Sequence, residues 1–329
     1  MNIRLLFSLA ALALAFAVAG CGKPNKLNIA SASIPAGPVE LKLKWTPGEK
    51  IIQEFNMEQT MRMNLPGQPA PMKQHMTMGE RLSLRVVKAD PDGGHELEMQ
   101  FVGAHVAMEM GKINMNYDSD KDSADGSTNP LATVFTRLIG AKIQYFLDAS
   151  NNVERIDGID DLISRISAGD KSGIFKSIFT ENYFKQIMAF NRFLPLNPVQ
   201  PGDSWPVKLE VPMASMGAMG MNYKLTFKGW EMVGKRNCAR IEMTGDIQSK
   251  SGAGAGPMGM TIAIPEGNLS GALWFDPELG ATVSSKMNQD MTMLMSMPKR
   301  ARPGLGATGP QTITNQLSQV IDFKVDSLK

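Results

Sequence analysis

Apolar and polar side chains alternate along most of this chain, and this period of two constrains its fold more than any other feature. Residues 39–45 alternate in this way, and so do residues 223–228 and 239–243. Because successive side chains of a strand point to opposite faces, the pattern predicts strands with one buried and one solvated face. Strands of this kind form antiparallel sheets, whose apolar face must be covered by other elements.

Turns rich in proline and glycine separate the alternating segments. Residues 46–49, 65–71, 90–94 and 276–280 contain Pro and Gly, several of them next to Asp or Glu. Pro presets the backbone for a turn and Gly accepts the left-handed conformation, so each of these segments predicts a connection between strands. A change of phase near Gly103 predicts a β-bulge in the strand that contains it.

Helical spacing of apolar residues occurs between two sets of strands. It predicts short helices over 130–139 and from Asp160, and a longer one over 174–194. The Pro-Gly turn at 47–49 has a counterpart at 201–203, which indicates an internal duplication.

We therefore predict a mainly β (α+β) fold with two similar antiparallel-sheet lobes. The lobes are expected to be curved or half-barrel-like, with short helices covering and joining them. The first lobe is predicted at residues 39–170, a helical connector at 171–199 and the second lobe at 200–329.

The first residues have the pattern of an export signal. Met1–Arg4 is basic, Leu5–Val18 is apolar, and Ala19-Gly20 precedes Cys21. This arrangement resembles the signal of bacterial lipoproteins. The resemblance implies that residues 1–20 are removed, that Cys21 carries acyl chains such as palmitate, and that residues 21–38 form a flexible tether.

The same resemblance implies a location. Gly22, rather than Asp, follows the modified cysteine, which in enterobacterial lipoproteins directs the protein to the outer membrane, here facing the periplasm. After the signal, no apolar run is long enough to span a bilayer, so the expected membrane contact is the lipid anchor. The formal net charge of +2 gives no basis for binding nucleic acid.

Methionine is unusually frequent, with 25 residues against 14 Phe. Ten methionines share the predicted inward phase of their strands: Met57, Met61, Met63, Met76, Met78, Met108, Met110, Met291, Met293 and Met295. They either fill the core beneath the helices or form a soft concave surface for a lipid or another apolar ligand, because the unbranched thioether adapts to varied shapes. Binding of Cu(I) is a third hypothesis, since thioethers are soft ligands.

Metal chemistry finds little further support. On a strand, His75 points away from Met76 and Met78, so these side chains cannot share one ion without a bulge. His95 and His105 have no His or Cys at a zinc-binding spacing. Residues 118–129 begin like a calcium loop but lack its Gly and its bidentate Glu, so a solvated loop is the favoured interpretation.

No motif indicates an enzyme. The glycines at 254–259 contain a proline and precede a predicted strand, which does not fit a nucleotide-binding turn. Cys238, without a partner cysteine if Cys21 is acylated, is expected to be a small packed residue. The basic residues at 299–302 are expected to form a solvated loop.

Several turn and packing residues resemble an uncharacterised family of bacterial secreted proteins. These are Leu194-Pro195, Pro198-Val199, the run 201–205, Cys238 and the hairpin at 271–276. The resemblance implies no activity. More loosely, curved sheets with one covered face resemble the periplasmic lipoprotein-carrier and lipid-binding folds.

Together these observations predict a lipid-anchored envelope protein that is not an enzyme and needs no cofactor. The leading hypothesis is that it binds a lipid or other apolar ligand in a methionine-lined concavity. The alternatives are a structural or partner-binding envelope lipoprotein without a small ligand, and a Cu(I)-binding protein.

Overall fold

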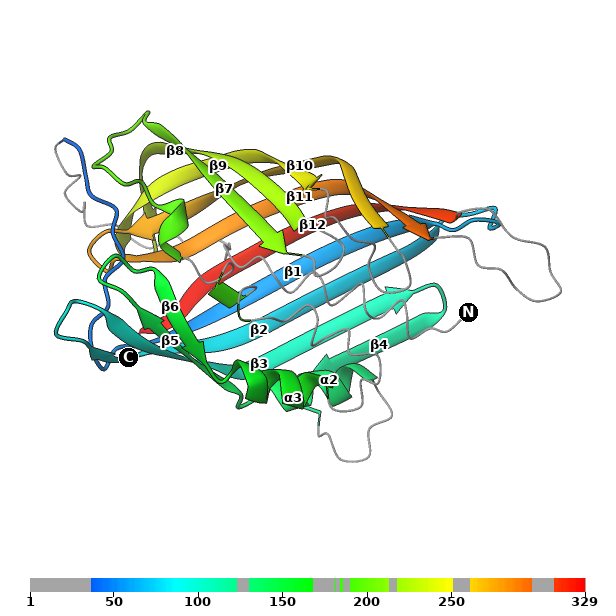
Figure 1. Ribbon diagram of the computed structural model, residues 1–329, viewed down its shortest axis with the longest axis horizontal. Coiled ribbons are helices and arrows are strands. Elements are labelled where there is room, and N and C mark those ends of the chain that lie inside the picture. Colours follow the sequence, from blue (N-terminus) through cyan, green and yellow to red (C-terminus); the bar gives the residue numbers. More distant parts are fainter. Residues whose placement is uncertain are drawn as a thin grey trace.

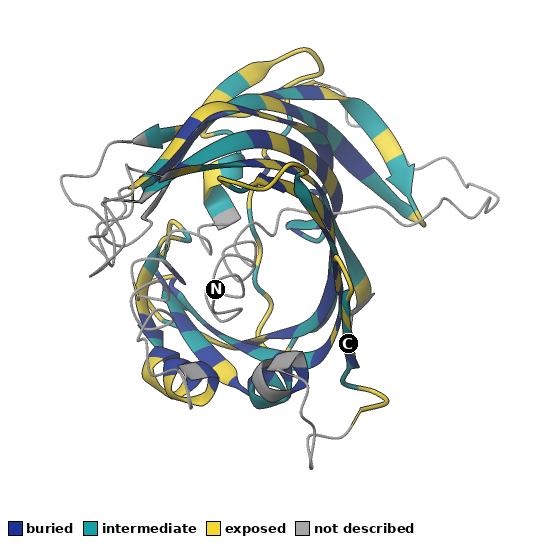
Figure 2. Ribbon diagram, turned by 90° about the vertical axis from the view of Figure 1, so that its right-hand side faces the viewer, coloured by how far each residue is buried: buried dark blue, intermediate teal, exposed yellow. Residues whose placement is uncertain are grey.

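The computed structural model describes residues 37–122, 130–167, 181, 184–185, 190–212, 218–250, 261–297 and 311–328. These residues form one antiparallel sheet of 12 strands that curls over but stays open (Figures 1 and 2). The strands are β1 Lys50–Asn64, β2 Met72–Ala89, β3 His95–Met110, β4 Ile113–Asp118, β5 Lys142–Leu147, β6 Val153–Asp157, β7 Ser204–Pro212, β8 Ala218–Val233, β9 Arg236–Lys250, β10 Thr261–Asp276, β11 Ala281–Met297 and β12 Gln311–Leu328. The predicted curved, mainly antiparallel β fold is confirmed.

The strands of the first predicted lobe, β1–β6, and those of the second, β7–β12, belong to the same sheet. The strand order is β6-β5-β3-β2-β1-β12-β11-β10-β9-β8-β7, with β4 also paired to β3. β1 and β12 pair along most of their length, with Met57 opposite Ile321. The two predicted lobes are therefore two halves of one continuous sheet, while the residue boundaries proposed for them remain a prediction.

Two short helices lie at the lower edge of the sheet in Figure 1. Helix α2 (Pro130–Leu138) contacts β3 and β4, and α3 (Ile159–Ser167) contacts β5. The ring of Phe135 stacks on Tyr117 of β4, with the ring centroids 6.3 Å apart. Asp160 and Asp161 lie in the first turn of α3, where carboxylates favour the helix dipole. Both short helices begin within a residue of their predicted starts.

The predicted longer helix at 174–194 falls mostly outside the described residues. Within its range the structure describes Glu181, Phe184 and Lys185 as helical, and a 3-10 helix, η2, at Phe190–Phe193.

A β-bulge lets β3 change its partner. The register between β2 and β3 shifts between the pairs Arg81–Gly103 and Leu82–Phe101, as the change of phase near Gly103 predicts. Before the bulge β3 pairs with β5, and after it β3 pairs with β4. The bulge therefore splits this end of the sheet into two branches, since an extra residue bends the strand that carries it.

Glycines allow neighbouring strands to curl closely at the other end. A Cβ atom at Gly271 would lie 2.1 Å from the carbonyl oxygen of Lys286 on β11, and one at Gly245 would lie 2.1 Å from that of Asn222 on β8. Glycine in a strand marks such close backbone approaches.

The prediction of a strand at residues 39–45 is wrong. Val39 forms only an isolated bridge with Val199, and Lys44 donates its N–H to the carbonyl of Gly280, 3.0 Å away. Val199 and Gly280 belong to different segments of the chain, so a continuous ladder cannot form. The alternation instead reflects burial, because Leu41 is only 1% exposed while Lys42 and Glu40 face solvent.

Candidate functional site

The predicted methionines meet on one side of the central strands. Met57 of β1 lies opposite Met78 of β2, and Met76 lies opposite Met108 of β3. Residues that are paired across antiparallel strands point to the same face. Each set of paired residues therefore forms a row across β3, β2, β1, β12 and β11, and every second residue along a strand belongs to a row on the same face. We call this side the inner face, and the opposite side the outer face.

The inner face is buried. Of the ten predicted methionines, nine are buried and Met293 is partly buried against the same core. Side chains on the convex side of a curved sheet spread apart, so the buried phase is the concave one. The predicted placement of the methionines is confirmed, and their role as ligand contacts remains a prediction.

Buried amides interrupt the methionines. Five amide side chains lie on the inner face with exposures of 1 to 5%: Gln59, Gln74, Gln289, Asn315 and Gln319. Gln319 pairs with both Gln59 and Gln289, so three amides form a row across β1, β12 and β11. We call these three residues the amide row. The sequence interpretation missed it, although Gln59 lies between Met57 and Met61 in the same phase.

Sulfur atoms orient several of these amides. Gln319 donates Nε2–H to Oε1 of Gln289, whose own Nε2 donates to Sδ of Met287, 3.6 Å away. Asn315 donates Nδ2–H to Sδ of Met295 at 3.1 Å. Because a thioether sulfur only accepts, the NH₂ groups of Gln289 and Asn315 point toward sulfur.

Three of the five amide oxygens on the inner face have no hydrogen-bond partner among the described residues. Within the described part of the chain, Oε1 of Gln59, Oδ1 of Asn315 and Oε1 of Gln319 have no hydrogen-bond partner. Buried polar atoms are normally paired, so these three acceptors need an explanation. The middle of the inner face therefore carries unpaired hydrogen-bond acceptors that are surrounded by apolar side chains.

An ionisable group also lies on the inner face. Glu80 of β2 is 7% exposed and lies between Phe55 of β1 and Ala104 of β3. One of its carboxylate oxygens has no partner among the described residues. Burial raises the pKa of Glu80 from 4.5 to about 7, because desolvation disfavours the charged form.

The outer face carries His75 and the acidic residues Asp118 and Asp120, which are possible metal ligands by residue type. His75 lies there, with Nε2 3.9 Å from a carboxylate oxygen of Glu58. Asp120 is bound by Arg81 at 2.6 Å, and Asp118 by Lys121 at 2.5 Å. Across the described ranges no group of three or more His, Cys, Asp or Glu side chains could hold a metal ion. Residues 123–129 of the predicted acidic loop lie outside those ranges, and Cu(I) binding remains a prediction.

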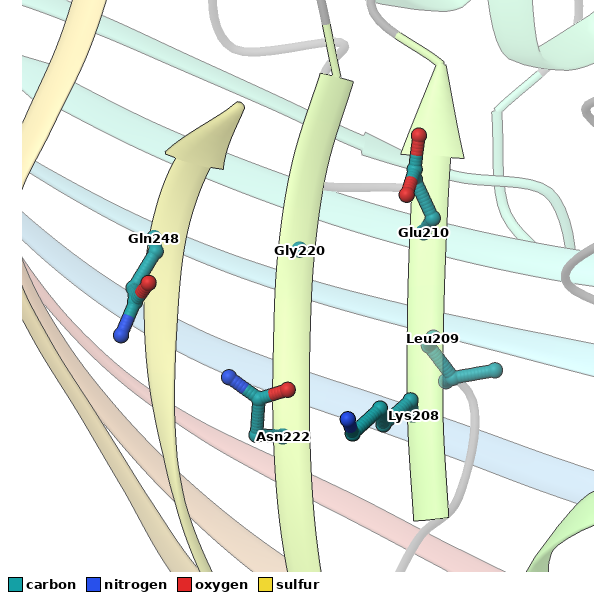
Figure 3. Close-up of a pocket in the computed structure, with 6 residues that line it drawn as sticks. All are labelled: Lys208, Leu209, Glu210, Gly220, Asn222 and Gln248. Carbon is teal, nitrogen blue, oxygen red and sulfur yellow. The ribbon is translucent and has the colours of Figure 1, made fainter. Parts of the chain in front are cut away.

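The outer face also has a small polar cavity of about 220 Å³ over β7, β8 and β9 (Figure 3). It is lined by Lys208, Leu209, Glu210, Gly220, Asn222 and Gln248. Gly220 has no side chain, which leaves the hollow between Glu210 and Gln248. Asn222 and Gln248 both donate to Asp246 at 2.8 Å. This polar surface does not suit an apolar ligand.

Cys238 is packed, as predicted. It is buried in β9, and its Sγ lies 3.7 Å from the carbonyl oxygen of Arg236. Burial raises the pKa of the Cys238 thiol to about 12, with the nearby carboxylate of Asp276 adding to the shift. The thiol is therefore protonated and unreactive at neutral pH.

The predicted anchor at Cys21, the tether up to residue 36, and the loops at 254–259 and 299–302 lie outside the described residues. In the part of the chain that is described, neither α2 nor α3 has the length and apolar character that crossing a membrane requires.

A family model described as a family of unknown function (DUF6263) matches residues 92–282. No curated protein matches the chain.

Three solved structures show weak likeness. A structure of lipovitellin with lipid–protein interactions has 9% identity and a TM-score of 0.43, covering 87% of this chain. This chain spans only 26% of that lipovitellin chain. A Bacteroides fragilis protein described as exported, with a YmcC-like fold, has 12% identity and a TM-score of 0.31 over 88% of this chain and 100% of its own. A DUF1329 family protein from Desulfovibrio piger has 11% identity and a TM-score of 0.12, covering 84% and 85%. These scores are too low to carry an argument about function, which must rest on the chain's own residues.

Proposed function

Because this chain belongs to the family of unknown function DUF6263, its activity must be inferred from its own site, and we propose that it binds a lipid or other apolar ligand on its inner face. In this proposal the protein is not an enzyme and acts in the cell envelope. The observation that supports it is the collection of methionines on one side of a single curved sheet. Flexible thioethers suit a surface that must adapt to varied apolar shapes.

Lipid binding by the intact protein is the direct test. The full chain would be purified from bacterial membranes in mild detergent and its mass measured under native conditions. We expect a noncovalent lipid mass that is lost on denaturation. A protein that carries no lipid, and takes up none from a lipid extract, would instead favour the structural or partner-binding alternative.

Replacing Met57 and Met78 together with glutamine should weaken binding of a fluorescent long-chain fatty acid about tenfold. Their side chains pair across β1 and β2, and glutamine has a similar shape but a polar end. A tenfold loss corresponds to about 1.4 kcal/mol, roughly what burying two methylene-sized apolar groups contributes. Met232→Gln, near the end of β8 and away from the central strands, is the matched control. Equal affinity of all three proteins would place binding elsewhere.

We also propose that Cys21 is the membrane anchor. The support is the resemblance of residues 1–21 to a lipoprotein signal. Two or more acyl chains give stable attachment, whereas a single chain gives only marginal binding. Cys21→Ser should therefore move the protein from the detergent-rich to the aqueous phase in a phase-partition assay. Retention of the Cys21→Ser variant in the detergent-rich phase would contradict acylation at this residue.

A further inference from the structure

The amide row divides the inner face into apolar halves. On one side lie Met57, Ile321 and Met287, which pair across β1, β12 and β11. On the other side lie Met61, Leu317 and Met291, paired across the same strands. Adjacent rows are two residues apart along a strand, or roughly 7 Å. A ligand lying along the strands would thus meet apolar residues, then the amide row, then apolar residues again.

Among the described residues, the buried atoms of the amide row that lack a hydrogen-bond partner are oxygens, which are acceptors. The NH₂ groups of Gln319 and Gln289 each donate one hydrogen bond, in a series that ends on the sulfur of Met287. The carbonyl oxygens of Gln59 and Gln319 have no partner in the described part of the chain, and neither has that of Asn315, four residues before Gln319 on the same face of β12. Only a group that donates an O–H or N–H bond can satisfy these oxygens.

We propose that the ligand carries a hydroxyl or amide N–H donor within its apolar length, as in a hydroxylated or amide-linked acyl chain. Its donor lies on the amide row, and its apolar parts lie on the methionine rows on either side. This inference rests on the proposed function and narrows it, because a plain hydrocarbon chain would leave the buried acceptors without a hydrogen bond. A ligand that supplies a donor gains that bond and should bind more tightly, since buried acceptors without donors are unfavourable.

Two probes that differ only in a mid-chain hydroxyl test this proposal: 12-hydroxystearate and stearate. We expect the wild-type chain to bind 12-hydroxystearate about tenfold more tightly, measured by displacement of a fluorescent fatty acid. Equal affinities, or tighter binding of stearate, would overturn the inference and leave the proposed function standing. Failure to bind either probe would overturn the proposed function as well.

A triple variant locates the preference. Replacing Gln59, Gln289 and Gln319 with methionine removes the amide row, and methionine already occupies neighbouring positions of the same face. Methionine is unbranched and adaptable, so we expect this variant to fold, with a circular dichroism spectrum like that of the wild type. It should bind the two probes with equal affinity. A folded triple variant that keeps the tenfold preference would overturn the assignment to the amide row.

Gln316→Met is the matched control. Gln316 lies on the same strand, β12, but its side chain is exposed on the outer face. This variant should keep the wild-type preference for the hydroxylated probe. Loss of the preference in Gln316→Met would show that it does not depend on the inner face and would overturn the proposal. Because the preference is first measured on the wild-type chain, the test does not depend on any variant folding.

Discussion

Glu80→Gln should raise the free energy of unfolding by about 3 kcal/mol at pH 8 and change it little at pH 4. The pKa of Glu80 is raised from 4.5 to about 7 by burial. At about 1.4 kcal/mol for each pKa unit, this shift amounts to roughly 3 kcal/mol. Glutamine has a similar shape and no charge, so it removes the cost of burying a carboxylate at high pH.

The sign follows from proton linkage. Below pH 4.5 the carboxyl group is neutral in both the folded and the unfolded chain, and its burial costs no charge. Between pH 4.5 and about 7 the unfolded chain loses its proton while the folded chain keeps it, so stability falls as the pH rises. Above about 7 the loss is complete and constant. Wild-type stability should therefore decline over this window, and the decline should be smaller in Glu80→Gln.

Urea unfolding at pH 4, 6 and 8, followed by circular dichroism, measures this effect. Glu109→Gln is the control, because Glu109 lies on the neighbouring strand β3 with an exposed side chain. We expect the control to differ from wild type by less than about 0.5 kcal/mol at each pH. If Glu80→Gln and Glu109→Gln behave alike, Glu80 is not held in an apolar environment.

Gly271→Val should lower the free energy of unfolding by about 3 kcal/mol, at the upper end of the cost of overpacking. A Cβ atom at this position would lie 2.1 Å from the carbonyl oxygen of Lys286 and 2.9 Å from the Cα of Met287. Both are backbone atoms of β11, so β10 would have to move away from its partner strand. No side-chain rotation can relieve that contact.

Ser270→Val is the control, because it introduces the same residue into β10 without the close backbone contact. Ser270 is the preceding residue of β10, and its exposed side chain points to the opposite face. Valine favours strands, so this control should stay within about 0.5 kcal/mol of wild type in urea unfolding. A stable Gly271→Val protein with wild-type β10–β11 pairing would contradict a close approach of the two backbones at this position.

Local patterns in the sequence predicted much of the fold. The alternation around Met57 and Met291, the turn at 90–94 and the bulge near Gly103 depend only on neighbouring residues, and the structure confirms them. The pairing of β1 with β12 depends on residues far apart in the chain, which no local pattern specifies. Residues 39–45 show the opposite error, because burial of Leu41 produced strand-like alternation without a partner strand.

The sequence predicted the methionines of the candidate site but not its buried amides. Apolar periodicity located the methionines of the inner face, since they follow the burial pattern of their strands. The same rule assigns polar residues to solvent, so it passed over Gln59, Gln289 and Gln319 even though their positions fall in the inward phase. Position in the alternation, rather than residue type, was the signal that would have found the amide row.

The pairing of β1 with β12 has a consequence for how the chain folds. Met57 and Ile321 face each other although most of the chain lies between them. Until β12 arrives, one side of β1 is an open edge with free N–H and C=O groups, which other chains can join. Contacts between such distant segments also form slowly. Newly synthesised protein should therefore depend on holding chaperones until β12 is available.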